Sequence, residues 1–401
     1  MSNPKLRFRR EDGTNYPDWE DLKMRDIFTE IIEKNRSDLP VLSILQGRGT
    51  VYRDSSDRNI LYDKKSTTNY KAMKKGDFII HLRTFEGGLE CATLDGISSP
   101  AYKILRTNKL VSEAYKDYFR SRSFIEGRLA IAVTGVRDGK NIEMSTFWDI
   151  SVPVPCLEEQ QKIADFLSSV DEVIAQSEAE VSNLQQQKKA AMQKIFSQEV
   201  RFRRDDGTEF PKWESRQISD FAICFAGATP STSTKEYWNN GTISWLSSGE
   251  VNKKQIYETE KKISQLGYDK CSTKMVKPNT VIMALAGQGK TRGTVAITRI
   301  PVCTNQSLCA IETDDTVIDD YLYQYLETRY DDLRHISSGD GTRGGLNLKL
   351  INNYTVSIPH TEEQQKIANL FSAYDEAIGY AKQELDKWKE FKKGLLQQMF
   401  V

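Results

Sequence analysis

The sequence predicts an α+β protein with two similar domains of mixed α/β structure, separated by two long coiled-coil helices and related as a pseudo-twofold tandem repeat. Three observations predict this fold class. A 14-residue marker motif occurs twice, the motif EEQQKIA occurs twice, and apolar residues follow each EEQQKIA at heptad spacing. The length of 401 residues agrees, because it exceeds what one hydrophobic core usually serves.

The repeated motifs define the order of the elements. The marker RFRREDGTNYPDWE at residues 7–20 returns as RFRRDDGTEFPKWE at 201–214, with ten identities in fourteen positions. EEQQKIA occupies residues 158–164 and 362–368, so each repeat runs from a marker through a variable region to a helix. The predicted segments are a first domain at 1–155, a helix at 156–200, a second domain at 201–359 and a helix at 360–401.

Each EEQQKIA motif begins a predicted helix of about 40 residues, or about 60 Å at 1.5 Å per residue. Apolar or small residues recur in alternating steps of four and three, which is the seam of a coiled coil. The seam includes Ile163, Leu167, Val170, Ile174 and Leu184 in the first helix and Ile367, Phe371, Ile378, Leu385 and Trp388 in the second. Both helices keep this register down to a lysine, at 188 and 392, that interrupts each seam.

A pseudo-twofold axis crossing the helices would pair them antiparallel, with the domains at opposite ends. The sequence leaves a parallel pair open. It is also compatible with surface helices that each pack on their own domain, and with seams that form a homodimer. The shared register weighs against separate surface helices, because such helices need no common pattern.

Composition restricts the class of protein. Lys+Arg and Asp+Glu both number 56, so binding to nucleic acid would need a local basic face or a partner. The chain has no signal-peptide-like start and no run of about 18 apolar residues, which predicts a cytoplasmic protein that does not enter a membrane. Six cysteines without a CxxC pair and three dispersed histidines predict reduced thiols and no metal site.

The variable regions read as short strands separated by Gly, Asn and Ser, with helical stretches at 114–119 and 319–327. Segments 74–88 and 276–290 match by pattern: each is a buried strand that leads into a glycine-rich, partly basic loop. A common scaffold with different loops is how recognition diversifies.

The loop ALAGQGKT at 284–291 resembles a relaxed Walker A motif, which would make the chain an ATP-using enzyme. A P-loop needs a helix directly after its Lys-Thr, whereas RGTVAIT at 292–298 favours a strand. We therefore expect either an ordinary hairpin connection or a loop whose Lys290 and Arg292 meet phosphates or bases.

Glycine-rich stretches at 134–141 and 339–347 also carry basic residues where backbone can approach a ligand closely. Phe85 is equally compatible with a core position, and for Trp245 we favour the core. The candidate contacts to phosphate or bases are Arg83, Phe85, Arg137, Lys140, Lys290, Thr291, Arg292, Thr342 and Arg343.

The doubled marker, the stretch NTVIMALAGQGKTRGTVAI, TNQSLCAI at 304–311, and Pro followed by EEQQKIA and a long helix together resemble type I restriction-modification specificity subunits. The resemblance covers essentially the whole chain. It implies two target-recognition domains, each binding one half of a bipartite double-stranded DNA target, with the helices as spacer and ruler. It also implies two methyltransferase subunits and two restriction/translocase subunits as partners.

The resemblance further implies a non-catalytic subunit, with S-adenosylmethionine, ATP and Mg on the partner subunits and no cofactor on this chain. The sequence agrees, because it contains no NPPY-type or DPPY-type tetrapeptide. A different class of protein, a symmetric coiled-coil scaffold with no role in nucleic-acid binding, is also compatible with the duplicated pattern.

Overall fold

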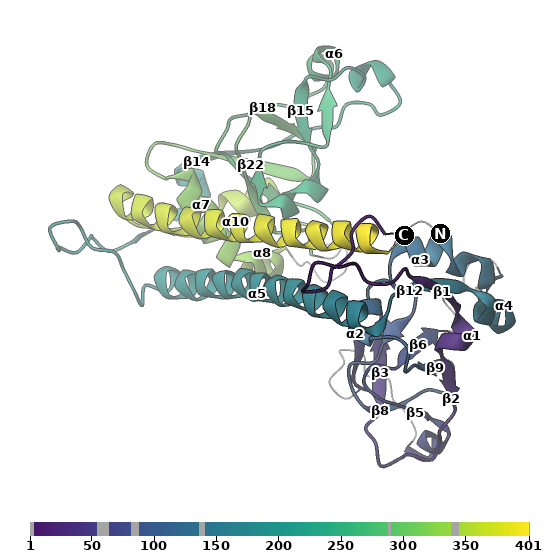
Figure 1. Cartoon of the computed structure of the whole chain (residues 1–401). Helices are drawn as coiled ribbons and strands as arrows, with labels where there is room; N and C mark the ends of the chain where they lie inside the picture. The colour runs from purple at the N-terminus through teal and green to yellow at the C-terminus, as the bar shows by residue number, and fades with distance from the viewer. Residues whose placement is uncertain are drawn as a thin grey trace. The chain divides into compact units, whose positions relative to one another are not determined.

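The structure is a computed structural model that describes residues 4–53, 64–81, 88–135, 141–287, 290–337 and 345–400. Its longest elements are α5 (Leu157–Phe196) and α10 (Thr361–Met399), of 40 and 39 residues (Figure 1), which confirms both predicted helices. The chain forms two compact units: unit 1 comprises residues 1–179 and 382–401, and unit 2 comprises residues 180–381. Each unit therefore contains part of both long helices.

Unit 1 is built on a four-stranded sheet in the order β2-β9-β6-β7, and β1 pairs antiparallel with β12 just before α5 begins. Besides the helices, its elements are β1 (Glu20–Lys23), α1 (Met24–Ile27), β2 (Thr29–Ile31), β3 (Leu42–Leu45), β4 (Gly49–Tyr52), η2 (Lys64–Asn69), β5 (Lys71–Met73), β6 (Phe78–His81), β7 (Glu90–Cys91), β8 (Gly96–Ser98), β9 (Tyr102–Arg106), α2 (Ser112–Tyr115), α3 (Arg122–Gly127), η3 (Leu129–Ala132), β10 (Val133–Thr134), β11 (Asn141–Ile142), α4 (Met144–Asp149) and β12 (Ser151–Val154).

Unit 2 is built on a five-stranded sheet in the order β14-β22-β19-β20-β16, and β13 pairs antiparallel with β23 just before α10 begins. Its elements are β13 (Glu214–Gln217), η5 (Ile218–Asp220), β14 (Ala222–Ala226), η6 (Lys235–Tyr237), β15 (Ile243–Leu246), η7 (Ser248–Lys253), β16 (Gln255–Ile256), β17 (Lys261–Ile263), α6 (Gln265–Asp269), β18 (Met275–Val276), β19 (Val281–Ala284), β20 (Val295–Thr298), β21 (Val302–Thr304), β22 (Leu308–Thr313), α7 (Asp319–Thr328), α8 (Tyr330–Ile336), α9 (Leu348–Asn352) and β23 (Thr355–Ile358).

The two units share a scaffold. Strands β2-β9-β6-β7 correspond in order to β14-β22-β19-β20, and the central strands β6 and β19 come from the two segments that the sequence pattern matched. Their apolar residues are buried against the cores of the two units, as expected for strands covered on both faces. The helix expected at 319–327 is α7, whereas α2 begins earlier than expected and gives way to turns at Lys116.

The helices pack antiparallel within each unit. In unit 1 the first half of α5 lies against the end of α10, since Asp171 pairs with Lys392 at 2.6 Å. In unit 2 the end of α5 lies against the start of α10, since the rings of Phe196 and Phe371 stack with centroids 5.6 Å apart. Every seam residue named from the sequence is buried or half-buried, which confirms the heptad register. Within the described ranges, no helix is long and apolar enough to cross a membrane.

Candidate nucleic-acid interface

The marker and EEQQKIA motifs bind each other in unit 1. The carboxylate of Glu159 accepts hydrogen bonds from Arg7 Nε at 3.1 Å and Nη2 at 2.8 Å, and from Trp19 Nε1 at 3.0 Å. The Glu159 side chain is fully buried, so its charge needs these donors. The hydrogen bond from Arg7 to Glu159 also raises the pKa of Arg7. From the sequence alone, this acidic residue looks like an ordinary first-turn carboxylate.

Unit 2 repeats the same anchor. Glu363 accepts from Arg201 Nε at 3.2 Å and Nη2 at 2.7 Å, and from Trp213 Nε1 at 3.0 Å. The sequence signal that could have revealed this contact is the joint occurrence of both motifs in each repeat. Each long helix therefore starts from a charged anchor that the marker supplies.

The next residue of the motif ties the helix to its domain. In unit 1 the amide of Gln160 accepts from Val111 N at 2.8 Å and donates to Lys109 O at 3.0 Å and to Pro155 O at 2.9 Å. Gln364 makes the equivalent bonds in unit 2, to Ile318 N, Thr316 O and Pro359 O at 2.8, 3.0 and 3.0 Å. The two glutamines hold the domain scaffolds in a defined orientation on the helix starts.

The Walker-like loop connects two strands. β19 pairs antiparallel with β20, which begins at Val295, so a strand and not a helix follows the Lys-Thr pair. This finding rules out a P-loop and confirms the predicted strand. The connection is fastened to α8, because Tyr330 Oη donates to the carbonyl of Lys290 at 2.7 Å. Lys290 is exposed, while Thr291 and Arg292, the next two residues of the chain, are half-buried.

The remaining candidate contacts lie outside the described residues. These are Arg83, Phe85, Arg137, Lys140, Thr342 and Arg343. Trp245, by contrast, is described and lies in the core: it is buried, and its Nε1 donates to Ala228 O at 3.1 Å.

A groove of about 310 Å³ beside Lys290 adds residues that the sequence did not indicate. Asn252 and Lys254 line it together with Lys290, Glu327 and Tyr330. Lys254 has a φ of 65°, a backbone conformation that non-glycine residues rarely adopt and that is concentrated at functional sites. The groove therefore combines an amide and two lysines, which are groups that contact bases and phosphates. Lys254 is paired with Glu327 at 3.2 Å, so Lys290 is the more exposed of the two charges offered to DNA.

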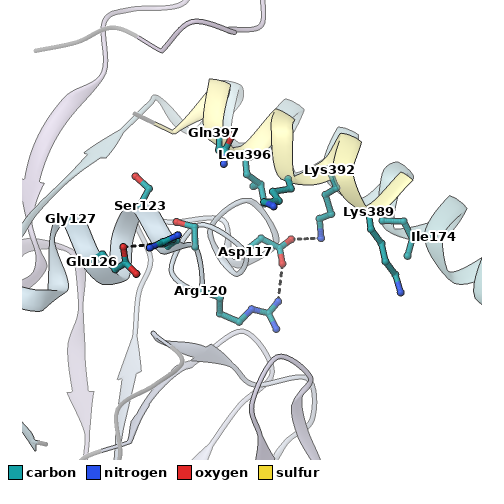
Figure 2. Close-up of a pocket in the computed structure, with 13 residues that line it drawn as sticks. Asp117, Arg120, Ser123, Glu126, Gly127, Ile174, Lys389, Lys392, Leu396 and Gln397 are labelled. Carbon is teal, nitrogen blue, oxygen red and sulfur yellow. Dashed lines mark hydrogen bonds and ion pairs between the residues drawn. The ribbon is translucent and has the colours of Figure 1, made fainter. Parts of the chain in front are cut away.

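A larger groove, of about 1020 Å³, lies in unit 1 between α3 and the long helices (Figure 2). Its exposed cations are matched by carboxylates. Arg122 pairs with Glu126 at 2.7 Å and Lys389 with Glu178 at 2.7 Å. Lys393 has a neighbouring carboxylate as well. This groove is therefore not the local basic face that the neutral composition requires.

Metal-binding groups do not gather in the described part of the chain. Among those residues, no cluster of three or more His, Cys, Asp or Glu side chains is arranged to hold an ion. The six cysteines form no disulfide.

Comparisons with known sequences all match the chain to one protein family. Residues 17–186 and 211–389 match the family model described as the type I restriction modification DNA specificity domain. The chain is 30% identical to the Type I restriction enzyme MjaIX specificity subunit of Methanocaldococcus jannaschii, over 51% of this chain and 48% of that protein. It is 23% identical to the MjaVIII specificity subunit of the same organism, over 98% and 95%. The EcoR124I/EcoR124II specificity subunit of Escherichia coli is 22% identical over 59% of each chain. The first of these matches thus spans about half of the relative's length.

Solved structures share the fold. The type I restriction-modification S subunit from M. genitalium superposes with a TM-score of 0.61 at 15% identity, covering 100% of this chain and 99% of that one. A chain described under complex assembly and conformational transition of the type I R-M system gives a TM-score of 0.56 at 15% identity, with 96% of each chain covered.

Proposed function

Because the chain belongs to the family of type I restriction-modification DNA specificity subunits, we propose that it binds a bipartite DNA target, with one half-site contacted by each domain. The observation that carries this proposal is the duplicated anchor. Arg7, Trp19 and Glu159 recur as Arg201, Trp213 and Glu363 with closely similar distances. A repeated scaffold with different loops suits two different half-sites.

The long helices act as the spacer between the half-sites. α5 has 40 residues and α10 has 39, so each helix spans about 60 Å at 1.5 Å per residue. One turn of DNA is about 34 Å, so helices of this length are sufficient for half-sites roughly one turn apart.

The DNA contacts in the second domain come from the β19–β20 connection and the groove beside it. Lys290 supplies an exposed charge for phosphate, while Thr291 and Arg292 lie in the same connection. Asn252 and Lys254 join them across the groove. The other candidate contacts lie outside the described residues and stay predictions from the sequence: Arg83, Phe85, Arg137 and Lys140 in the first domain, and Thr342 and Arg343 in the second.

The chain itself is non-catalytic and acts by carrying its partners to DNA in the cytoplasm. Two methyltransferase subunits dock on it and, for restriction, two restriction/translocase subunits. Those partners bind S-adenosylmethionine, ATP and Mg. A solved chain of the same fold comes from work on complex assembly of a type I R-M system, which supports this role.

A domain exchange tests the assignment of one domain to one half-site. Residues 201–355 are replaced by the matching stretch of another specificity subunit, and the methylated motif is determined. The proposal predicts that one half-site changes while the other half-site and the spacer stay the same. A change in both half-sites would refute it.

A second experiment tests the spacer. One heptad is inserted into each of α5 and α10 at a matched seam position, which keeps the seam in phase. The expected result is a motif with unchanged half-sites and an altered spacer, or loss of assembly. An unchanged motif would count against the helices as ruler.

A further inference from the structure

A chain of ion pairs leads from the helix seam of unit 1 into its domain. Lys392, one of the lysines that interrupt the heptad pattern, is mostly buried, with 15% of its side chain exposed. Its Nζ lies 2.6 Å from Oδ1 of Asp171 on α5 and 2.5 Å from Oδ2 of Asp117, in the turns that follow α2. Figure 2 shows the lysine reaching down from α10 to Asp117.

The series of ion pairs continues from Asp117 to the β3–β4 hairpin of the first domain. Asp117 pairs with Arg120 at 2.9 Å, and Arg120 with Glu90 at 3.5 Å. Glu90 is buried and accepts hydrogen bonds from the backbone N–H groups of Gly47 at 2.8 Å and Gly49 at 3.3 Å. Gly47 lies in the turn between β3 and β4, and Gly49 begins β4, so a continuous series of ion pairs and hydrogen bonds joins α10 to that hairpin.

Unit 2 contains the counterpart. Lys188, the lysine in the α5 seam, lies 2.7 Å from Asp375 on α10 and 3.3 Å from Glu327 at the end of α7. The second carboxylate oxygen of Glu327 lies 3.2 Å from Lys254, which lines the groove that contains Lys290. The seam pair is the same as in unit 1, whereas the link into the domain uses different residues.

The connection is crossed with respect to the sequence. Lys392 follows the second domain in the chain but contacts the first domain, and Lys188 follows the first domain but contacts the second. We propose that Lys392 and Lys188 are positioning residues: Lys392 orients the domain of unit 1 through Asp117, and Lys188 orients the groove beside Lys290 in unit 2 through Glu327, so that each affects recognition of one half-site. This inference rests on the proposed recognition of a bipartite target.

The chemistry of buried ion pairs favours a positioning role for these two lysines over a role that only stabilises the contact between the helices. Apolar seam contacts are non-directional and tolerate small displacements of one helix along its neighbour. A buried ammonium group tolerates much less, because moving away from its carboxylates leaves an unpaired charge in a low-dielectric interior. Each lysine here has two carboxylates, one on the partner helix and one in the domain, so it couples the helix position to the domain orientation.

Two link variants and one control variant test this inference. Asp117→Asn and Glu327→Gln weaken the link to the domain but keep the seam pairs Lys392–Asp171 and Lys188–Asp375. Glu178→Gln is the control, because it weakens a pair that joins α5 to Lys389 of α10 at 2.7 Å. Asp171 and Asp375 are not used as controls, because Asp171 also pairs with Lys116 at 3.0 Å and Asp375 also accepts a hydrogen bond from Gln324 at 2.8 Å, and both partners lie in the domains. Each full-length variant is assembled with the methyltransferase subunits, and methylation rates are measured on duplexes that carry the cognate target or a single base change in either half-site.

Discrimination is the ratio of the methylation rate on the cognate target to the rate on a target with one base change. Asp117→Asn should lower this ratio on the order of tenfold for base changes in one half-site, and Glu327→Gln should lower it by a similar factor for base changes in the second half-site. The control Glu178→Gln should change neither by more than about twofold. Should Asp117→Asn fail to fold, Lys392→Arg replaces it, because it keeps the charge but alters the reach, with the exposed Lys393→Arg as its control. The same half-site must then be affected.

The outcomes distinguish this inference from the proposed function. A wild-type complex with a bipartite motif, together with link variants that affect both half-sites equally or neither, would overturn the inference alone. A wild-type complex that methylates no bipartite motif would overturn the proposed function and the inference with it. Loss confined to opposite half-sites in the two link variants supports the inference.

Discussion

The indole nitrogen of Trp19 donates a hydrogen bond to the carboxylate of Glu159 across 140 positions of sequence, at 3.0 Å. Trp213 donates to Glu363 at the same distance in the second repeat. The marker and the EEQQKIA motif are therefore two parts of one anchor, which forms separately in each unit.

Glu159→Ala should destabilise unit 1 by about 3 kcal/mol, because it leaves the mostly buried Arg7 guanidinium and the Trp19 N–H without their acceptor. Hydrogen exchange of the backbone amides, followed unit by unit, measures the effect. Glu363→Ala is the matched control and should accelerate hydrogen exchange in unit 2. Equal acceleration in both units from either substitution would contradict two separate anchors.

Phe400→Ala should destabilise unit 1 by about 3–5 kcal/mol although it lies at the far end of the chain. The ring is buried and stacks on Tyr118 with centroids 4.7 Å apart, and it meets Trp19 at 5.8 Å. Phe391→Ala, at a ring that is 48% exposed on the preceding helix α10, is the control and should have little effect on the unfolding free energy. Similar losses from both substitutions would show that the C-terminal ring is not a core residue.

The heptad seam and the shared scaffold could be predicted because they depend on periodicity, which is local in the sequence. Lys188 and Lys392 could only be recognised as interruptions of the seam, since their partners Asp375 and Asp171 are 187 and 221 positions away. The burial of Glu159 escaped prediction for the same reason. The strand after the Walker-like loop was predictable, because Gly293 and the β-branched residues that follow it favour a strand.

The predicted DNA contacts are harder to locate from the sequence, because loop residues follow no periodic pattern. Their identity is constrained by the ligand that they bind and not by packing in the core. Lys254 illustrates this limit. Nothing in its sequence context distinguishes it from the many lysines of the chain, and its place in the groove arises from the positive φ that ends η7 and from the neighbouring strand β20.

Lys290→Ala should weaken DNA binding by the assembled complex and reduce the slope of log K against log salt concentration by about 0.9, the value for one phosphate contact. The side chain is exposed, so the melting temperature should stay the same. Lys262→Ala, at an exposed lysine on β17, is the control for loss of one charge. An unchanged slope for Lys290→Ala would remove this residue from the interface.

The unfolding free energy of unit 2 should depend on the ionisation of Asp319. Burial raises the pKa of this carboxyl from 3.8 to about 6, despite a hydrogen bond from Thr313. The protonated form therefore favours folding, a contribution that is complete below about pH 4 and is lost as the pH rises through about 6. Relative to wild type, Asp319→Asn should gain stability between about pH 4 and pH 7, as measured by urea unfolding. A constant difference across that range would contradict the raised pKa.

Single-molecule sequencing of adenine methylation tests the central claim most directly. Genomic DNA is compared from cells that express this chain with its methyltransferase subunit and from cells that express the methyltransferase alone. The account predicts a bipartite motif that is methylated only when the chain is present. No chain-dependent motif, in cells where assembly of the two proteins has been verified, would contradict it and favour a scaffold that does not bind DNA.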